Sequence, residues 1–153
     1  MKLVILDPYN QEEVSVLKNH VTGEFEENLN IILLNTSRYS KEEYLSVKNS
    51  SNDINECLMS FNGSDINNFC FFNGTKDNKL IQMSIKNLQQ RDFIEQSLTY
   101  AFDRLDAETV TVFSKDNCAR QLDNLGFENL GEYNGVNTYV KDRVLEENIG
   151  RVR

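Results

Sequence analysis

The sequence predicts a mixed α/β protein with a mostly antiparallel sheet and flanking helices. Three strand-like segments, 56–61, 66–72 and 79–85, are separated by turns that contain Asn-Gly. Both residues tolerate positive φ, so this pair favours tight turns between antiparallel strands. The third segment leads directly into an amphipathic helix and then into a strand at 108–113. That order indicates a parallel strand pair, and about seven strands are expected in all.

Capping residues divide the first fifty positions into elements. The expected elements are a strand at 2–6 and helices at 11–20, 24–35 and 41–48. Asn10 is a typical N-cap, Ser40 with Glu43 forms a capping-box pattern, and Gly23 is expected to end the first helix. The segment 24–35 would also fit a strand over 31–34, but its helical period holds over the longer window.

The central helix follows the third strand of the meander. Asn87 and Gln90 resemble a capping box, so the helix can begin as early as Leu88. Its expected buried stripe comprises Ile94, Leu98, Ala101, Phe102 and Leu105. Beyond the strand at 108–113, Asp116 or Asn117 would cap a short helix that stops at Gly126, and a hairpin of 127–133 and 136–141 would follow. We expect one domain at 1–141 and a charged tail at 142–153.

Composition excludes several classes of function. The formal net charge of -8 repels phosphate backbones, so nucleic acid is not expected as a partner. No apolar run approaches the roughly 20 residues of a membrane helix, and Asp7-Pro8 interrupts the first apolar run. We therefore expect a cytoplasmic protein that does not enter membranes, and the oligomeric state cannot be read from the chain.

The three cysteines, Cys57, Cys70 and Cys118, have no CxxC spacing and predict neither a disulfide framework nor a metal site. If Phe61 pairs with Ile66 across the first Asn-Gly turn, Cys57 falls opposite Cys70. Such a pair is either a redox couple or two reduced thiols on one apolar face, and a reducing compartment favours the second.

The order of elements, and the segment 110–132 with its Leu-Gly-Phe at 125–127, resembles the GCN5-related N-acetyltransferase superfamily. This resemblance implies acetyl-coenzyme A as cofactor and an amine, on a small molecule or a protein, as acceptor. It also implies that the strand–turn–helix after Ile85 binds the cofactor. Gln90 and Arg91 match the first positions of the family pattern Q/R-x-x-G-x-G/A. With Ile85, they are the expected cofactor-binding residues.

Both glycines of that pattern are replaced, by Phe93 and Glu95. Glycine allows the backbone to approach the diphosphate closely, a Phe side chain can obstruct the approach, and a carboxylate repels it. Arg91 would offset part of the repulsion. The sequence therefore indicates a divergent relative with a degenerate acetyl-coenzyme A loop.

No catalytic residue can be assigned from the sequence. Leu122 stands where many members of this family carry a Tyr that acts as acid toward the departing thiolate, so a different residue would have to serve. Tyr133 and Tyr139 are candidates only by proximity in the fold. The single histidine, His20, lies in the first helix, and Glu56 or Glu95 would act as a base only if burial raised its pKa. Cys118 is expected to be a packed thiol rather than a nucleophile.

Two functions remain open. The first is direct acetyl transfer from acetyl-coenzyme A to an amine, with backbone near Ile85 polarising the carbonyl. The second is a catalytically inactive relative that uses the same scaffold to bind a partner or another ligand.

Overall fold

The computed structural model describes residues 2–115 and 119–144. Its strands are β1 Lys2–Ile5, β2 Asp53–Asn62, β3 Asp65–Thr75, β4 Leu80–Ile85, β5 Thr109–Ser114, β6 Glu128–Tyr133 and β7 Val136–Asp142. Its helices are α1 Gln11–Lys18, α2 Gly23–Thr36, α3 Lys41–Ser50, α4 Arg91–Thr99, the π-helix η1 Tyr100–Arg104, and α5 Ala119–Asn124. The expected caps at Asp116 or Asn117, the side chain of Cys118 and most of the expected tail lie outside the described residues.

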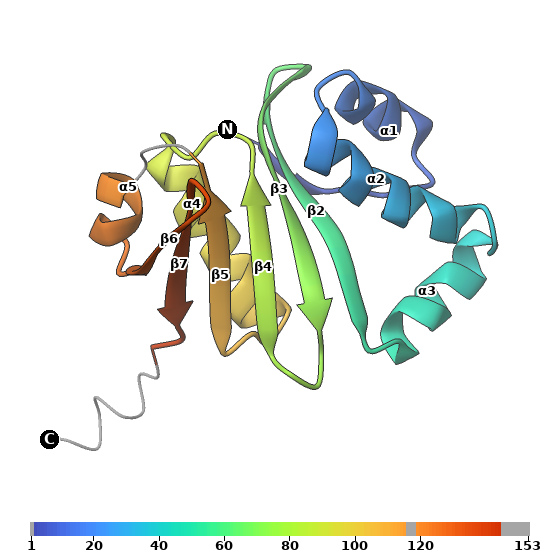
Figure 1. Cartoon of the computed structure of the whole chain (residues 1–153). Coiled ribbons are helices and arrows are strands. Elements are labelled where there is room, and N and C mark those ends of the chain that lie inside the picture. Colours follow the sequence, from blue (N-terminus) through green and yellow to red (C-terminus); the bar gives the residue numbers. More distant parts are fainter. Residues whose placement is uncertain (1, 116–118, 145–153) are drawn as a thin grey trace, which may run out of the picture.

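The strands form one sheet in the order β1-β2-β3-β4-β5-β7-β6 (Figure 1). Every neighbouring pair is antiparallel except β4 and β5, which are parallel. The predicted fold class, seven-stranded sheet and parallel pair are therefore confirmed. No described helix is long and apolar enough to span a bilayer, and no described cluster of three His, Cys, Asp or Glu side chains could hold a metal ion.

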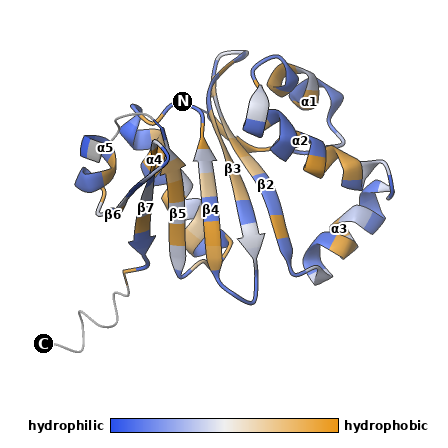
Figure 2. Ribbon diagram, viewed as in Figure 1, coloured by the Kyte–Doolittle hydropathy of each residue, from blue (hydrophilic) through white to orange (hydrophobic). Residues whose placement is uncertain are grey.

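Helices cover both faces of the sheet. On one face, α1 and α2 bury a cluster that includes Leu17, Leu29 and Phe69. On the other, α4 packs over a cluster that includes Phe72 and Ile94 (Figure 1). Hydrophobic residues accordingly lie along β2 to β5, whereas the outermost strand β6 is hydrophilic and exposed (Figure 2). Alternation along β3 sends neighbouring side chains to opposite clusters.

The N-terminal helices confirm the predicted caps and correct one boundary. Asn10 accepts hydrogen bonds from the first turn of α1, and Ser40 with Glu43 forms a complete capping box on α3. The segment 24–35 is helical, as the longer period predicted. However, Gly23 does not end α1, which stops at Lys18. It begins α2 with φ +55°, a conformation that glycine adopts without strain.

The central helix begins later than predicted. Its N-cap is Gln90, and the Asn87 side chain instead accepts a hydrogen bond from the Gln89 N–H at 2.9 Å. The last turn widens into η1, where the Leu105 N–H donates to the Tyr100 carbonyl five residues back. The α-helical period therefore fails before Leu105, which is only partly buried.

A β-bulge makes the predicted cysteine pairing wrong. Phe61 does pair with Ile66, but the register shifts between Ser60 and Phe61, because one extra residue of β3 is inserted there. Cys57 consequently lies opposite Phe71, and Cys70 lies opposite Leu58. The two thiols are free and fall in different clusters, on opposite faces of the sheet. Burial raises the pKa of both thiols, which keeps them protonated.

Candidate functional site

The parallel strands β4 and β5 separate midway. They pair only from Leu80–Thr109 to Gln82–Thr111. Beyond that point β4 remains paired with β3 to its end at Ile85, and β5 remains paired with β7 to Ser114. Each strand is thus held by its outer neighbour while the two diverge. We call this divergence, formed by residues 83–85 and 112–114, the splay.

The backbone of Ile85 faces the splay. The next residue, Lys86, donates its N–H to the Phe69 carbonyl of β3 at 3.0 Å. Hydrogen-bonded and non-hydrogen-bonded pairs alternate in an antiparallel ladder, so the adjacent pair Cys70–Ile85 is a non-bonded one. The Ile85 N–H and C=O groups therefore point away from β3, toward β5. Because pairing with β5 has already ended, this N–H is directed at the gap between the strands.

Helix α4 begins next to the splay, with its first-turn N–H groups uncapped by a side chain. Gln90, the N-cap, makes no side-chain capping bond. The N–H groups of the first turn, together with the helix dipole, form the kind of site that binds anions. Asp92 in the same turn contributes an opposing negative charge.

The predicted binding side chains near this turn already have protein partners. The Gln90 Oε1 atom accepts hydrogen bonds from the side-chain amides of Asn67 and Asn68, at 3.3 and 3.0 Å. Arg91 Nε donates to Glu95 Oε1 at 3.0 Å, and both side chains are about half exposed. The Gln90 side chain is therefore turned toward β3, and the charge of Arg91 is partly neutralised by Glu95.

The two residues that replace glycine have different surroundings. Phe93 is 1% exposed and belongs to the cluster between α4 and the sheet, so its ring lies beneath the helix. Its bulk fills core space and does not cover the outer side of the first turn. Glu95 lies on the exposed side of α4, where it forms an ion pair with Arg91. Phe93 therefore leaves the first-turn N–H groups uncovered, whereas Asp92 and Glu95 place negative charge beside them.

Two polar contacts that sequence reasoning missed fix the loop before α4. Asn68, 1% exposed, donates to the Asn87 carbonyl at 2.9 Å and accepts from the Asn87 N–H at 3.0 Å. Gln121 of α5 donates to Gln89 Oε1 at 2.6 Å, which connects α5 to the same loop. Nothing local in the sequence marks these contacts, because each joins elements that are distant along the chain.

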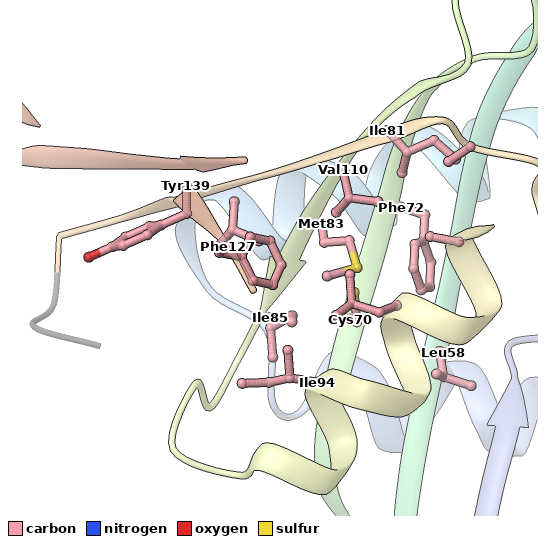
Figure 3. Close-up of a cluster of buried hydrophobic side chains, with 14 of the residues drawn as sticks. Leu58, Cys70, Phe72, Ile81, Met83, Ile85, Ile94, Val110, Phe127 and Tyr139 are labelled. Carbon is pink, nitrogen blue, oxygen red and sulfur yellow. The ribbon is translucent and has the colours of Figure 1, made fainter. Parts of the chain in front are cut away.

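The candidate proton-transfer residues are dispersed. Leu122 is fully buried, and Tyr133 is 80% exposed at the β6–β7 turn. Tyr139 is buried on β7, and Figure 3 shows its hydroxyl directed away from Phe127 and Ile85. His20 is exposed just beyond α1. Leu122 cannot transfer a proton, and the structure does not place Tyr133, Tyr139 or His20 as an acid or base at the splay.

A separate pocket of about 460 Å³ lies at the other end of the sheet. Its walls are α3, the start of β2 and the end of η1. Glu56 lies at its base, with a side chain that is 11% exposed. The Glu56 carboxylate accepts a hydrogen bond from the Tyr100 hydroxyl at 2.5 Å, and Lys48 Nζ lies 3.5 Å from the same oxygen. Glu56 therefore accepts a hydrogen bond within this pocket and does not lie at the splay as a general base.

The Tyr100–Glu56 contact predicts a stability change in alkali. Burial and the hydrogen bond to Glu56 raise the pKa of Tyr100 above its usual value of 10.0. Its contribution to stability is therefore fully present below the unfolded value and is lost as the pH rises from there toward the folded pKa. We expect the stability of Tyr100→Phe to decline less steeply than that of the wild type between about pH 10 and 12. Urea unfolding across that range measures it, with Tyr133→Phe as the exposed control; equal slopes for wild type and Tyr100→Phe would contradict it.

The fold matches solved N-acetyltransferase structures. PseH of Campylobacter jejuni is 12% identical, with a TM-score of 0.59 over 93% of this chain and 99% of that one. The structure of PseH in complex with acetyl coenzyme A is 14% identical to this chain, with a TM-score of 0.58 over 94% of this chain and 100% of that one. A mutant of the spermidine N-acetyltransferase SpeG from Vibrio cholerae is 13% identical to this chain, with a TM-score of 0.58 over the full length of both chains.

Neither a protein-family model nor a curated protein sequence matches the chain. At these sequence identities the structural similarity establishes the fold alone. The chain has the fold of the GCN5-related N-acetyltransferases, as its order of elements predicted.

Proposed function

We propose that this protein is an N-acetyltransferase that transfers the acetyl group of acetyl-coenzyme A to an amine. The observation that carries the proposal is the splay: β4 and β5 stop pairing after Gln82 while each remains fully bonded to its outer neighbour. Support comes from the shared fold and from PseH, which has been solved with acetyl coenzyme A. The acceptor is unidentified, and the net charge of -8 favours a cationic amine.

The protein's contribution is placement and polarisation. The cofactor would supply a reactive thioester. The Ile85 N–H, directed into the splay, is the donor that would polarise its carbonyl oxygen. The first-turn N–H groups of α4 and the Arg91 guanidinium would face the diphosphate. Gln90 would contribute by orienting the loop through Asn68, since its side-chain oxygen is already an acceptor there.

Charge substitutions on α4 test whether this turn meets the diphosphate. We expect Arg91→Gln to weaken acetyl-coenzyme A binding about two- to fivefold, and Glu95→Gln to strengthen it by a similar factor. Both changes should diminish at high salt, because the groups are exposed. Calorimetry measures the affinities, with Arg38→Gln, just beyond the C-cap of α2, as a matched control. Equal affinities for all four proteins would place the diphosphate elsewhere.

The proposed transferase function itself is tested by titrating acetyl-coenzyme A into the protein, with coenzyme A and desulfo-coenzyme A as controls. We expect a dissociation constant in the micromolar range, followed by amine-dependent thiol release with a panel that includes spermidine. The absence of binding heat and of a thermal shift at millimolar acetyl-coenzyme A would contradict the proposed transferase function.

The second candidate is a GNAT-fold binding module without catalysis. It is favoured by the Gln89–Gln121 hydrogen bond, which connects α5 to the loop before α4, and by the Arg91–Glu95 ion pair. In a binding module of this kind, the Gln89–Gln121 and Arg91–Glu95 contacts would close the loop before α4 to a cofactor. Gln121→Ala separates the two candidates: a variant that binds acetyl-coenzyme A where wild type does not would show that the hydrogen bond blocks the site.

A further inference from the structure

The pocket between α3, β2 and η1 has the features of a binding site that is separate from the splay. Its volume of about 460 Å³ is within the range of small-molecule sites. It lies at the end of the sheet where β4 begins, because the first residues of β2 pair with the last residues of β3 at Thr75, and Thr75 pairs with Leu80. The splay lies at the other end of β4. A ligand here would not share the proposed acetyl-transfer site.

One wall of the pocket is built from an unusual helical segment. In η1 the hydrogen bonds run from residue i+5 to residue i, and such π-turns often occur at functional sites. A π-turn holds more residues than an α-turn, so Tyr100 and Arg104, four positions apart, lie on nearly the same side. Tyr100 reaches Glu56, and Arg104 lines the pocket. Arg104 also lies close enough to Tyr100 to offset a small part of the rise that burial and Glu56 cause in the pKa of Tyr100.

The pocket presents the largely buried carboxylate of Glu56 and a rim of mixed charge, where Lys76 and Arg104 line the pocket together with Asp53 and Asp106. Glu56 receives its hydrogen bond from Tyr100 on one oxygen, Oε1, which is also the atom nearest Lys48. At the rim, Lys76 Nζ donates only to the carbonyls of Lys48 and Asn49 among the described residues. Arg104 likewise has no carboxylate within ion-pair distance in the described part of the chain. Of the two rim carboxylates, Asp106 is paired with Lys79 and Arg143, so an acceptor at the base and cationic donors at the rim are present together.

We propose that this pocket binds a small zwitterion of the α-amino acid type, with its ammonium group at Glu56 and its carboxylate at Arg104 and Lys76. A zwitterion leaves the local charge balance unchanged, whereas a ligand with a net charge would add an uncompensated charge beside a largely buried group. Tyr44, half-buried, and Val47 of α3 provide an apolar wall for the ligand's side chain. The proposal does not depend on the transferase reaction.

The test uses the whole chain without acetyl-coenzyme A. Each proteinogenic amino acid is screened by thermal shift at about 10 mM, since a ligand that binds only the folded state raises the melting temperature. The best amino acid is then titrated by calorimetry beside its amide, which lacks the carboxylate, and its N-acetyl derivative, which lacks the ammonium. We expect both derivatives to bind at least about tenfold more weakly. Equal binding of either derivative, or no shift with any amino acid, would overturn the proposal.

Variants place the ligand in this pocket. Arg104→Gln changes an exposed rim residue and is expected to weaken binding about tenfold, as is Glu56→Gln. Arg120→Gln, exposed on α5, is the matched control and should leave binding unchanged. Glu56→Gln also alters the contact with Tyr100. If Glu56→Gln misfolds for that reason, the affinity of Arg104→Gln alone decides the test. Unchanged affinity in Arg104→Gln would refute the pocket as the site.

Discussion

Phe93→Gly, which restores the first glycine of the family pattern, is expected to destabilise the protein by about 4 to 6 kcal/mol. Removing a fully buried Phe side chain typically costs about 3 to 5 kcal/mol, and glycine inside a helix costs about 1 kcal/mol more. The ring is 1% exposed and packs between α4 and the sheet. The substitution therefore removes core rather than opening a cofactor loop.

The measurement is urea unfolding of Phe93→Gly beside Glu95→Gly, which restores the second glycine of the pattern. Glu95 is exposed, so its substitution should cost only about 1 to 1.5 kcal/mol, from helix propensity and the ion pair to Arg91. If Phe93→Gly lowered the free energy of unfolding no more than Glu95→Gly does, Phe93 would not be part of the core.

Asn68→Ala is expected to produce the next largest loss, about 2 to 4 kcal/mol. One side chain makes three hydrogen bonds with the loop before α4, two to Asn87 and one to Gln90, and a fourth to the Phe69 N–H. Alanine would leave these groups without their partner at a largely buried position, and each unsatisfied group costs about 1 to 3 kcal/mol unless water replaces the bond. The first turn of α4 should also be held less firmly relative to Ile85.

Asn67→Ala is the matched control, because Asn67 is exposed and its amide reaches Gln90 alone. We expect it to lose less than about 1 kcal/mol of stability. Chemical unfolding gives the stabilities, and calorimetry with acetyl-coenzyme A gives the effect on binding. If Asn68→Ala matched Asn67→Ala in both, Asn68 would have no special role in holding the loop.

Local signals predicted the fold well. The Asn-Gly turns indicated the meander, and Asn10 and Ser40 marked helix starts, because caps and turns depend on a few neighbouring residues. Predictions failed where a distant residue intervened. The Asn87–Gln90 spacing fits a capping box, but Asn68 of β3 binds the Asn87 backbone, and the helix begins three residues later than its earliest expected start.

The candidate site was less predictable than the fold. Ile85, Gln90 and Arg91 are expected to bind the cofactor by resemblance alone. The Ile85 backbone faces the splay, and the binding role of all three residues stays a prediction. The splay itself cannot be read from the sequence, because it depends on where pairing between β4 and β5 stops while β3 and β7 hold the outer edges. The Glu56–Tyr100 contact joins residues 44 positions apart and was equally hidden.

The central claim, that the splay is a cofactor site, is tested most directly by following backbone amide resonances during titration with acetyl-coenzyme A. We predict that the largest shifts occur at Ile85, at Phe113 on the facing strand and in the first turn of α4. Tyr44 and Arg104, at the other end of the sheet, should remain unchanged. An absence of shifts at millimolar acetyl-coenzyme A, or shifts confined to Tyr44 and Arg104, would contradict the claim.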